Sequence, residues 1–448
     1  MTPGAIVWLR QDLRLRDNPA LQAAAQLGGP IVPVYILGDA EEQEFPAGGA
    51  SRWWLHRSLA ALGEDLRSRG SQLSLLRGPA LESLREVAAR TGARAVFWNR
   101  RYEPAAVARD IEVKTQLRGA GLVAESFNGS LLREPWEIQN GTGHPYRVFT
   151  PFKRRVLEDL NPAEPLRMPS RWQAPLAWPD SLSLDQLQLL PEIEWYGTIE
   201  HTWKPGEAGA HARLRSFAGK PLAAYAKTRD RPDLDETSAL SPHLHFGEIS
   251  VRQVWQALRG TRAQLRESTF VSELLWREFA HHLIYHFPHT PLQPLDRRFE
   301  RFEWVTDAAR LRAWQRGHTG FPIVDAGMRQ LWATGWMHNR VRMLVASLLT
   351  KHLRMHWVHG ARWFRDTLVD YDLANNTLGW QWVAGTGADA APYFRIFNPH
   401  LQAKRFDPDG DYVRQWVPEF GTPDYPEPIV DLAAARDAAL AAYTRLRR

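Results

Sequence analysis

The chain has 448 residues, and its contents of 44% hydrophobic and 24% charged residues are those of an ordinary globular protein with two or three domains. It contains no cysteine, which excludes disulfide bonds, thiolate nucleophiles and cysteine-ligated zinc or iron–sulfur centres. The net charge of +6 favours a polyanionic partner such as nucleic acid, but only weakly.

The first 130 residues alternate short apolar runs with helical stretches. The runs that predict strands are 5–10, 31–37, 72–76, 93–99 and 122–127. Because nearly continuous apolar strands separated by helices are typical of a parallel sheet covered on both faces, we predict a doubly wound α/β domain. No GxGxxG follows the first strand, which disfavours an NAD-type site. Arg10 interrupts the first apolar stretch and no run approaches ~18 residues, so we expect a cytoplasmic protein without a signal peptide or membrane span.

Residues 131–205 lose this regularity and are rich in proline and glycine, as expected of a linker that partly packs on its neighbours. After this segment helical periodicity dominates, for example in ISVRQVWQAL and NRVRMLVASLLTKHLRMHW. We therefore predict an α/β domain over 1–130, an interdomain linker over 131–205 and an all-α domain over 206–448.

One stretch of the helical domain, DYDLANNTLGWQW over 370–382, sets Asp372, Asn376 and Trp380 four residues apart. Side chains at i and i+4 are neighbours on a helix, so these three would form a stripe of carboxylate, amide and indole. Taken alone, the stripe favours the simpler interpretation of a solvated helix with one packed tryptophan, because a motif match is only a hypothesis.

Three further clusters combine polar and aromatic side chains with apolar helices. They are Thr237, Ser238 and Ser241; Glu273, Trp276 and Arg277; and Asn339 with Met343. Hydroxyls before a helix suit a phosphate group, although they usually only cap the helix. A carboxylate and a guanidinium four residues apart also form ordinary surface ion pairs. Four clusters in one domain together predict a cavity for a large polar aromatic ligand that carries phosphates.

The chain resembles the photolyase/cryptochrome family of flavoproteins over essentially its whole length. The opening IVWLRQDLRLRDNPAL is similar to the family's first strand and turn. The similar motifs of the helical domain are, in order, TSALSPHLHFG, ELLWREF, TGFPIVDAGMRQLWATGWMHNRVRM, DYDLANNTLGWQW and TGADAAPYFRIFNP. The resemblance implies an FAD enzyme of the bacterial type, a carbon–carbon lyase that uses light to split cyclobutane pyrimidine dimers in DNA.

By this resemblance a first group of residues would bind FAD. Asn376 would face the reactive edge of the flavin ring, and Arg342 would pair with Asp370. The group is Tyr225, Thr237, Ser238, Leu240, Ser241, Phe270, Arg277, Asn339, Arg342, Asp370, Asp372 and Asn376. The resemblance implies no metal.

By the same resemblance, a second group of residues would transfer electrons or bind the lesion. Trp380, Trp357 and Trp304 match the family's relay of tryptophans from the flavin to the surface. The residues that match the lesion pocket are Glu273, Trp276, Asn339, Arg340, Met343 and Trp382. The candidates for a phosphate-binding rim are Arg229, Arg340, Arg395 and Lys404, for each of which a solvated charge is an equal interpretation.

The implied mechanism passes an electron from photoexcited, reduced FAD to a dimer flipped out of the duplex, and the electron returns after the ring opens. Glu273 would stabilise the dimer radical. Two positions depart from the pattern. Ala239 stands where arginine is usual, so one phosphate contact is either missing or supplied elsewhere, and Phe270 stands where tryptophan is common, which keeps stacking but loses an N–H donor.

Three other functions fit parts of the sequence. A cryptochrome would share the fold and FAD but not repair, and a DNA-binding protein would use the tryptophan faces without a flavin. An enzyme for (6-4) photoproducts is expected to carry histidine where Met343 stands. The presence of Glu273, Trp276 and Met343 together favours dimer repair.

A light-harvesting chromophore is implied for the first domain. Glu103 in NRRYEP matches the acid that contacts this antenna, and GASRWWLHRSL and GSLLREPWEI are similar to folate-binding members. This similarity favours methenyltetrahydrofolate, with 8-hydroxy-deazaflavin or no antenna as the alternatives. We expect a monomer whose partner is DNA containing cyclobutane pyrimidine dimers.

Overall fold

The N-terminal region is a parallel sheet. The computed structural model describes residues 3–447 except 171–172, 259, 261 and 391–393. Its strands are β1 (Gly4–Leu9), β2 (Ile31–Leu37), β3 (Ser74–Arg77), β4 (Ala93–Asn99) and β5 (Val123–Phe127). They pair in parallel in the order β3-β2-β1-β4-β5. The predicted doubly wound sheet is therefore confirmed.

Helices cover both faces of this sheet, which explains why its strands are apolar throughout. They are α1 (Pro19–Gln26), α2 (Gly49–Arg67), α3 (Ala80–Thr91) and α4 (Pro104–Gly119), and the short η1 (Asp39–Glu42) follows β2. In β1, Ile6 and Trp8 face the core shared with α3 and α4, whereas Val7 and Leu9 face the core shared with α1 and α2. Successive side chains of a strand point to opposite faces, so a strand covered on both needs no polar alternation.

The segment predicted as a linker contains short helices and is anchored to both neighbours. Its elements are η2 (Pro135–Glu137), α5 (Phe149–Glu158), η3 (Asp185–Leu187) and α6 (Gly197–Thr202). The Oε2 atom of Glu278 accepts the backbone N–H groups of Leu132 (2.8 Å) and Arg133 (3.2 Å). Buried polar groups are normally satisfied in this way, so the start of the linker is fixed by the helical region.

A buried guanidinium joins three parts of the chain. Arg14 donates to the carbonyl oxygens of Asp17 (2.8 Å), Gly129 (2.6 Å) and Gly247 (2.8 Å), which belong to the first domain, the strand β5 exit and the helical region. Its side chain is about 1% exposed. Hydrogen bonds to charged groups are the strong ones, so Arg14 holds the two regions against each other.

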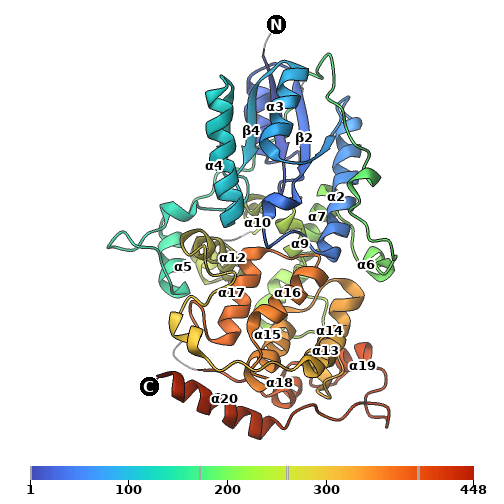
Figure 1. The fold of residues 1–448 in the computed structure, drawn as a ribbon, viewed down its shortest axis with the longest axis vertical. Coiled ribbons are helices and arrows are strands. Elements are labelled where there is room, and N and C mark those ends of the chain that lie inside the picture. Colours follow the sequence, from blue (N-terminus) through green and yellow to red (C-terminus); the bar gives the residue numbers. More distant parts are fainter. Residues whose placement is uncertain (1–2, 171–172, 259, 261, 391–393, 448) are drawn as a thin grey trace.

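The residues beyond 205 form the helical region, the lower part of Figure 1, with α20 along its lower edge. Its first helices are α7 (Glu207–Phe217), α8 (Lys220–Thr228), α9 (Ser241–His245), α10 (Val251–Ala257), α11 (Arg262–Glu267), α12 (Thr269–His286), η4 (Arg297–Arg301) and α13 (Ala308–Arg316). The remainder are α14 (Pro322–Thr334), α15 (Asn339–Ser347), η5 (Leu348–His352), α16 (Trp357–Thr367), α17 (Leu373–Ala384), α18 (Pro399–Phe406), α19 (Asp411–Trp416) and α20 (Leu432–Arg447). The predicted helical domain is thus observed.

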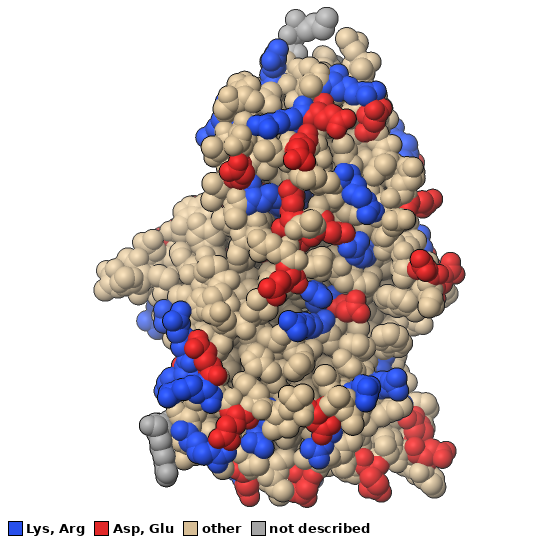
Figure 2. Space-filling view, in the orientation of Figure 1, with Lys and Arg blue, Asp and Glu red and all other residues tan. Residues whose placement is uncertain are grey.

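Surface charge is mixed rather than separated. On the face shown in Figure 2, basic and acidic side chains alternate without a broad patch of either sign. This agrees with a net charge of only +6 in a chain of 448 residues. Within the described part of the chain, every helix is too short or too polar to cross a membrane.

Candidate functional site

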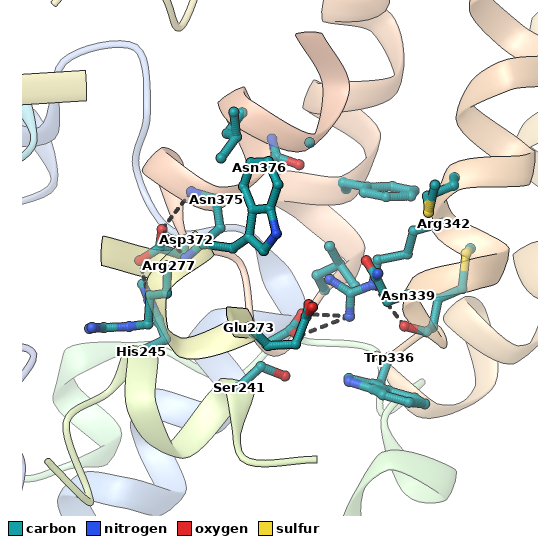
Figure 3. A pocket seen from close by; sticks show the side chains of 18 of the residues that line it. Ser241, His245, Glu273, Arg277, Trp336, Asn339, Arg342, Asp372, Asn375 and Asn376 are labelled. Carbon is teal, nitrogen blue, oxygen red and sulfur yellow. Dashed lines mark hydrogen bonds and ion pairs between the residues drawn. The ribbon is translucent and has the colours of Figure 1, made fainter. Parts of the chain in front are cut away.

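A cavity of about 520 Å³ lies among α8, α9, α12, α15 and α17. Figure 3 shows Asp372, Asn375 and His245 on one side of it and Asn339 and Trp336 on the other. The predicted site residues in its lining are Tyr225, Arg229, Ser238, Ser241, Phe270, Glu273, Trp276, Arg277, Asn339, Arg340, Arg342, Met343, Asp370, Asp372, Asn376, Trp380 and Trp382. All four polar–aromatic clusters of the sequence therefore contribute to one cavity.

Other predicted residues lie outside this lining: Thr237, Leu240, Trp304, Trp357, Arg395, Lys404 and Glu103. The Leu240 side chain is buried in an apolar core. Conversely, the lining includes residues that the sequence did not single out, notably His245, Trp336, Tyr371 and Asn375. All four fall within three of the quoted motifs, so motif membership was the signal that pointed to them.

The stripe on α17 begins with a cap rather than a helical residue. Asp372 is the N-cap of α17 and accepts the Asn375 N–H (2.8 Å), so the prediction that it lies on a helix face is corrected to the position just before the helix. Asn376 donates from Nδ2 to the Ala361 carbonyl oxygen (3.2 Å). Trp380 is buried against α16, where a Cβ at Gly360 would lie 2.0 Å from the indole. Only glycine at 360 allows this indole position.

The buried Asp372 carboxylate is held ionised. Its Oδ2 atom lies 3.4 Å from His245 Nδ1 and 3.6 Å from His281 Nε2. Burial raises the pKa of Asp372, but His281 and His245 outweigh it and hold the pKa of that carboxyl well below its usual range. The cavity therefore presents a fixed negative charge at the start of α17.

A second carboxylate is neutralised inside the same cavity. Arg342 donates to Asp370 (2.8 Å), as expected, and its Nε atom donates to the Met337 carbonyl oxygen (2.7 Å). The Asp370 side chain is only 2% exposed. Because a buried carboxylate is costly without a partner, the two residues form one unit.

The α12 residues face the cavity from the opposite wall. Glu273 pairs with Arg229 of the segment after α8, and not with Arg277 one turn along its own helix. Arg277 instead donates to the Ser130 carbonyl oxygen (2.8 Å). The alternative of an i,i+4 surface ion pair on α12 is therefore wrong.

One face of the Trp276 indole is covered by the linker. Phe149, the first residue of α5, stacks on Trp276 with ring centroids 3.6 Å apart and planes inclined by 9°. Trp276 also lines the cavity, so its other face remains available to a ligand. Trp382 also lines the cavity, and the guanidinium carbon of Arg395 lies 5.7 Å from the centroid of the Trp382 ring.

The three predicted relay tryptophans come from different segments: Trp380 is in α17, Trp357 is the first residue of α16, and Trp304 lies between η4 and α13. Trp304 and Trp357 both contact His356, at ring-centroid distances of 5.0 Å and 5.6 Å. The ring contacts recorded for Trp380 within the described residues are with Trp314 (6.1 Å) and Phe364 (5.0 Å). The indole N–H groups of Trp357 and Trp380 are buried and have no hydrogen-bond partner in the described chain.

The two departures from the family pattern have clear structural settings. Ala239 adopts a left-handed backbone conformation with φ of 46° and is buried between the hydroxyl residues Ser238 and Ser241. Phe270 contacts Phe217 (4.7 Å) and Tyr225 (5.3 Å) and lines the cavity. Position 270 therefore makes tilted and edge-on aromatic contacts without an indole donor.

A second cavity, of about 290 Å³, lies at the carboxyl ends of β1, β2 and β4. Its lining includes Trp8, Arg10, Tyr35 and Glu103. Glu103 is buried and pairs with Arg101 (3.0 Å). Ligands of open parallel sheets bind at this edge, so the cavity is a candidate site for a chromophore.

Comparisons with known proteins agree with this geometry. Residues 5–170 match the family described as DNA photolyase, and residues 270–424 match the FAD binding domain of DNA photolyase. The deoxyribodipyrimidine photo-lyase of Agrobacterium fabrum is 47% identical over 100% of this chain and 99% of its own length. Cryptochrome-2 of Arabidopsis thaliana is 37% identical over 100% of this chain and 80% of its own length.

Two solved structures share the fold. A bacterial class III photolyase from Agrobacterium tumefaciens has a TM-score of 0.95 and 47% identity, and the match covers 100% of this chain and 98% of that one. An archaeal photolyase from Sulfolobus tokodaii with two FAD molecules has a TM-score of 0.85 and 30% identity, covering 99% and 100%.

The chain therefore belongs to the DNA photolyase family of flavoproteins. Within that family it is an enzyme of light-driven DNA repair whose helical region is an FAD-binding domain. The cavity fits this cofactor: it offers the Ser238 and Ser241 hydroxyls and the Arg342–Asp370 pair as polar contacts in a largely apolar lining.

Proposed function

We propose that the chain repairs DNA by splitting cyclobutane pyrimidine dimers with light absorbed by FAD in the α12–α15–α17 cavity. The observation that carries this proposal is the sharing of one cavity by two sets of residues. The Arg342–Asp370 pair and Asp372 suit the flavin, whereas Trp276, Trp382 and the other predicted lesion contacts suit the flipped-out dimer. A reduced flavin and a dimer would then lie within reach of each other.

The chain's own residues hold the reactants. Bound FAD, reduced and excited by light, supplies the electron for the reaction. Ser238 and Ser241 line the cavity and would hold the cofactor's phosphates, while Asn376 and the ionised Asp372 would hold the flavin ring. This polar frame fixes the cofactor before any lesion binds, which is how a site gains its rate from positioning.

The lesion is held by aromatic walls and one carboxylate. Trp276 and Trp382 stack on the two bases, and Met343 fills the space against the ring. Glu273 hydrogen-bonds the pyrimidine edge and stabilises the charge that develops on the dimer. Trp304, Trp357 and Trp380 would carry an electron from the surface to the cofactor site when bound FAD needs reduction.

Dimer repair is preferred to the rival activities. An enzyme for (6-4) photoproducts needs a histidine acid at the lesion, and this cavity carries Met343 there. The neighbouring His338 caps α15 by accepting the Arg340 N–H (3.2 Å), and burial lowers its pKa to about 4, so it is a neutral structural group. Glu273 and Trp276, which a purely signalling cryptochrome would not need, both face the cavity.

The decisive experiment illuminates the reduced holoprotein with an oligonucleotide that contains one cyclobutane dimer. We expect pyrimidine absorbance to recover in the light and not in the dark, and a matching oligonucleotide with a (6-4) photoproduct to stay unchanged. Recovery of neither substrate would refute repair, and recovery of the (6-4) substrate alone would reassign the lesion.

We further propose that the cavity at the sheet edge binds an antenna chromophore, with methenyltetrahydrofolate favoured. Trp8 and Tyr35 offer aromatic surfaces there, and Arg10 and Glu103 offer polar contacts. Mass spectrometry of chromophores released from the purified protein tests this directly. A folate supports the proposal; a deazaflavin, a second FAD or an empty extract rejects it.

We expect the protein to be a monomer in solution, which light scattering checks.

Phe149→Ala is expected to weaken lesion binding about fivefold, because an aromatic pair contributes roughly 0.5–1.5 kcal/mol and the unsupported Trp276 indole would lose its orientation. Fluorescence anisotropy with dimer-containing DNA in the dark measures the affinity. Phe149→Tyr is the matched control, since it keeps the stacked ring. Equal affinity of the alanine variant and the unaltered protein would contradict a supporting role for Phe149.

A further inference from the structure

The two residues that follow α8, Arg229 and Asp230, form ion pairs with opposite walls of the cavity. Arg229 reaches α12, where its guanidinium pairs with Glu273. Asp230 reaches α15, where Oδ1 accepts from Arg340 Nη2 (2.8 Å) and Nε (3.3 Å). We call these two residues the Arg229–Asp230 clasp. It connects both walls of the cavity through ion pairs.

The Asp230–Arg340 pair lies where solvent still reaches it. The Arg340 side chain is 18% exposed and that of Asp230 is 35% exposed. Arg340 lines the cavity, whereas Asp230 does not. A pair in this position is open to competition by another anion, because neither charge is sealed from water.

Packing keeps Arg340 in place independently of its acid partner. The guanidinium carbon lies 4.5 Å from the Phe406 ring centroid, and Nη1 lies 3.7 Å from Met343 Sδ. A guanidinium held in this way accepts a carboxylate or a phosphate with the same forked geometry. Loss of the carboxylate would therefore leave a cation that still points to the lesion contacts.

We propose that Asp230 is a specificity-determining residue. It pairs with Arg340 in the place of a DNA phosphate, and this pair breaks only when the lesion of a bound strand enters the cavity. The inference rests on the proposed function. Undamaged DNA offers Arg340 a phosphate but no base for the aromatic walls. A dimer that stacks on Trp276 and Trp382 offsets the cost of breaking the Asp230–Arg340 pair.

Salt dependence gives a direct readout of this exchange. Each phosphate that a protein cation neutralises steepens the slope of log affinity against log salt by about 0.9 for duplex DNA. With undamaged duplex the unaltered protein keeps Arg340 paired with Asp230, so this contribution to the slope is absent. Asp230→Asn is expected to steepen the slope by about 0.9, to raise the affinity for undamaged duplex several-fold and to lower the ratio of lesion to undamaged binding.

The matched control is Asp180→Asn, which removes the same charge and releases Arg90 (2.6 Å) in the N-terminal region. It is expected to leave the slope unchanged. Adding Arg340→Gln to Asp230→Asn is expected to return the slope to that of the unaltered protein. A slope that stays the same in Asp230→Asn, or stays steep in the double variant, overturns the inference.

Light-driven repair measured on the same preparations separates the two proposals. If the unaltered protein repairs the dimer while Asp230→Asn shows no change in slope or in binding of undamaged DNA, only the role of Asp230 fails. If the unaltered protein neither binds nor repairs dimer-containing DNA, the proposed function itself fails, and Asp230 is then merely part of a surface ion pair.

Discussion

Arg342→Ala is expected to purify almost without flavin. The substitution would leave the Asp370 carboxylate, whose side chain is 2% exposed, without its only recorded charged partner in the described chain. Breaking a buried ion pair from one side costs about 3–5 kcal/mol, because the remaining charge is neither hydrated nor paired. That penalty falls on the cavity wall that we assign to FAD. The measurement is flavin absorbance relative to protein absorbance after purification.

Two further variants keep this experiment interpretable. Arg342→Lys retains the charge but not the forked geometry and is expected to hold an intermediate amount of flavin. Arg342→Ala combined with Asp370→Asn removes the stranded charge and is expected to regain much of the folding stability, but not the cofactor. A full complement of flavin in Arg342→Ala would rule out the role that we give to this pair.

Glu278→Gln is expected to stabilise the protein at neutral pH and to leave it unchanged in acid. Burial raises the pKa of Glu278 to about 7, despite the opposing effects of Arg277 and of the Arg133 and Leu132 N–H groups. Between pH 4.5, the ordinary value, and pH 7, the folded chain therefore binds a proton that the unfolded chain has released. This contribution to stability is complete below pH 4.5 and is lost as the pH rises through 7.

The size of the effect follows from the same two pKa values. A difference of about 2.5 between them corresponds to roughly 3 kcal/mol at pH 8. Glutamine stays neutral and keeps an oxygen for the Leu132 and Arg133 N–H groups. Urea unfolding at a series of pH values gives the free energies. Glu200→Gln, an exposed site, is the control; parallel pH profiles for Glu278→Gln and the unaltered protein would disprove the account.

The fold was predictable because its signals are local. Each strand of the sheet is a short apolar run, and each helix has its own period, so neither needs knowledge of distant residues. The covering of both sheet faces followed from the lack of alternation in runs such as 31–37. Long motifs in a fixed order likewise indicated the cavity, because resemblance carries tertiary information that periodicity lacks.

What the sequence missed depends on contacts between distant segments. The partner of Glu273 is Arg229, 44 positions away, and not Arg277 on the same helix. The sequence of the linker predicts a proline-rich connector, yet its residue Phe149 stacks on Trp276 in the cavity wall. Helix spacing predicts neighbours within one element, but it cannot predict which loop crosses the mouth of a cavity.

The buried Arg14 has a practical consequence for protein engineering. Its side chain donates to the carbonyl oxygens of Asp17, Gly129 and Gly247. The sheet region and the helical region therefore depend on the same hydrogen-bond donor. A chimera that grafts this helical half onto a foreign sheet half must therefore bring an arginine to the same spot. Without this arginine, the interface between the grafted regions would contain buried carbonyl groups without hydrogen-bond donors, which would destabilise it.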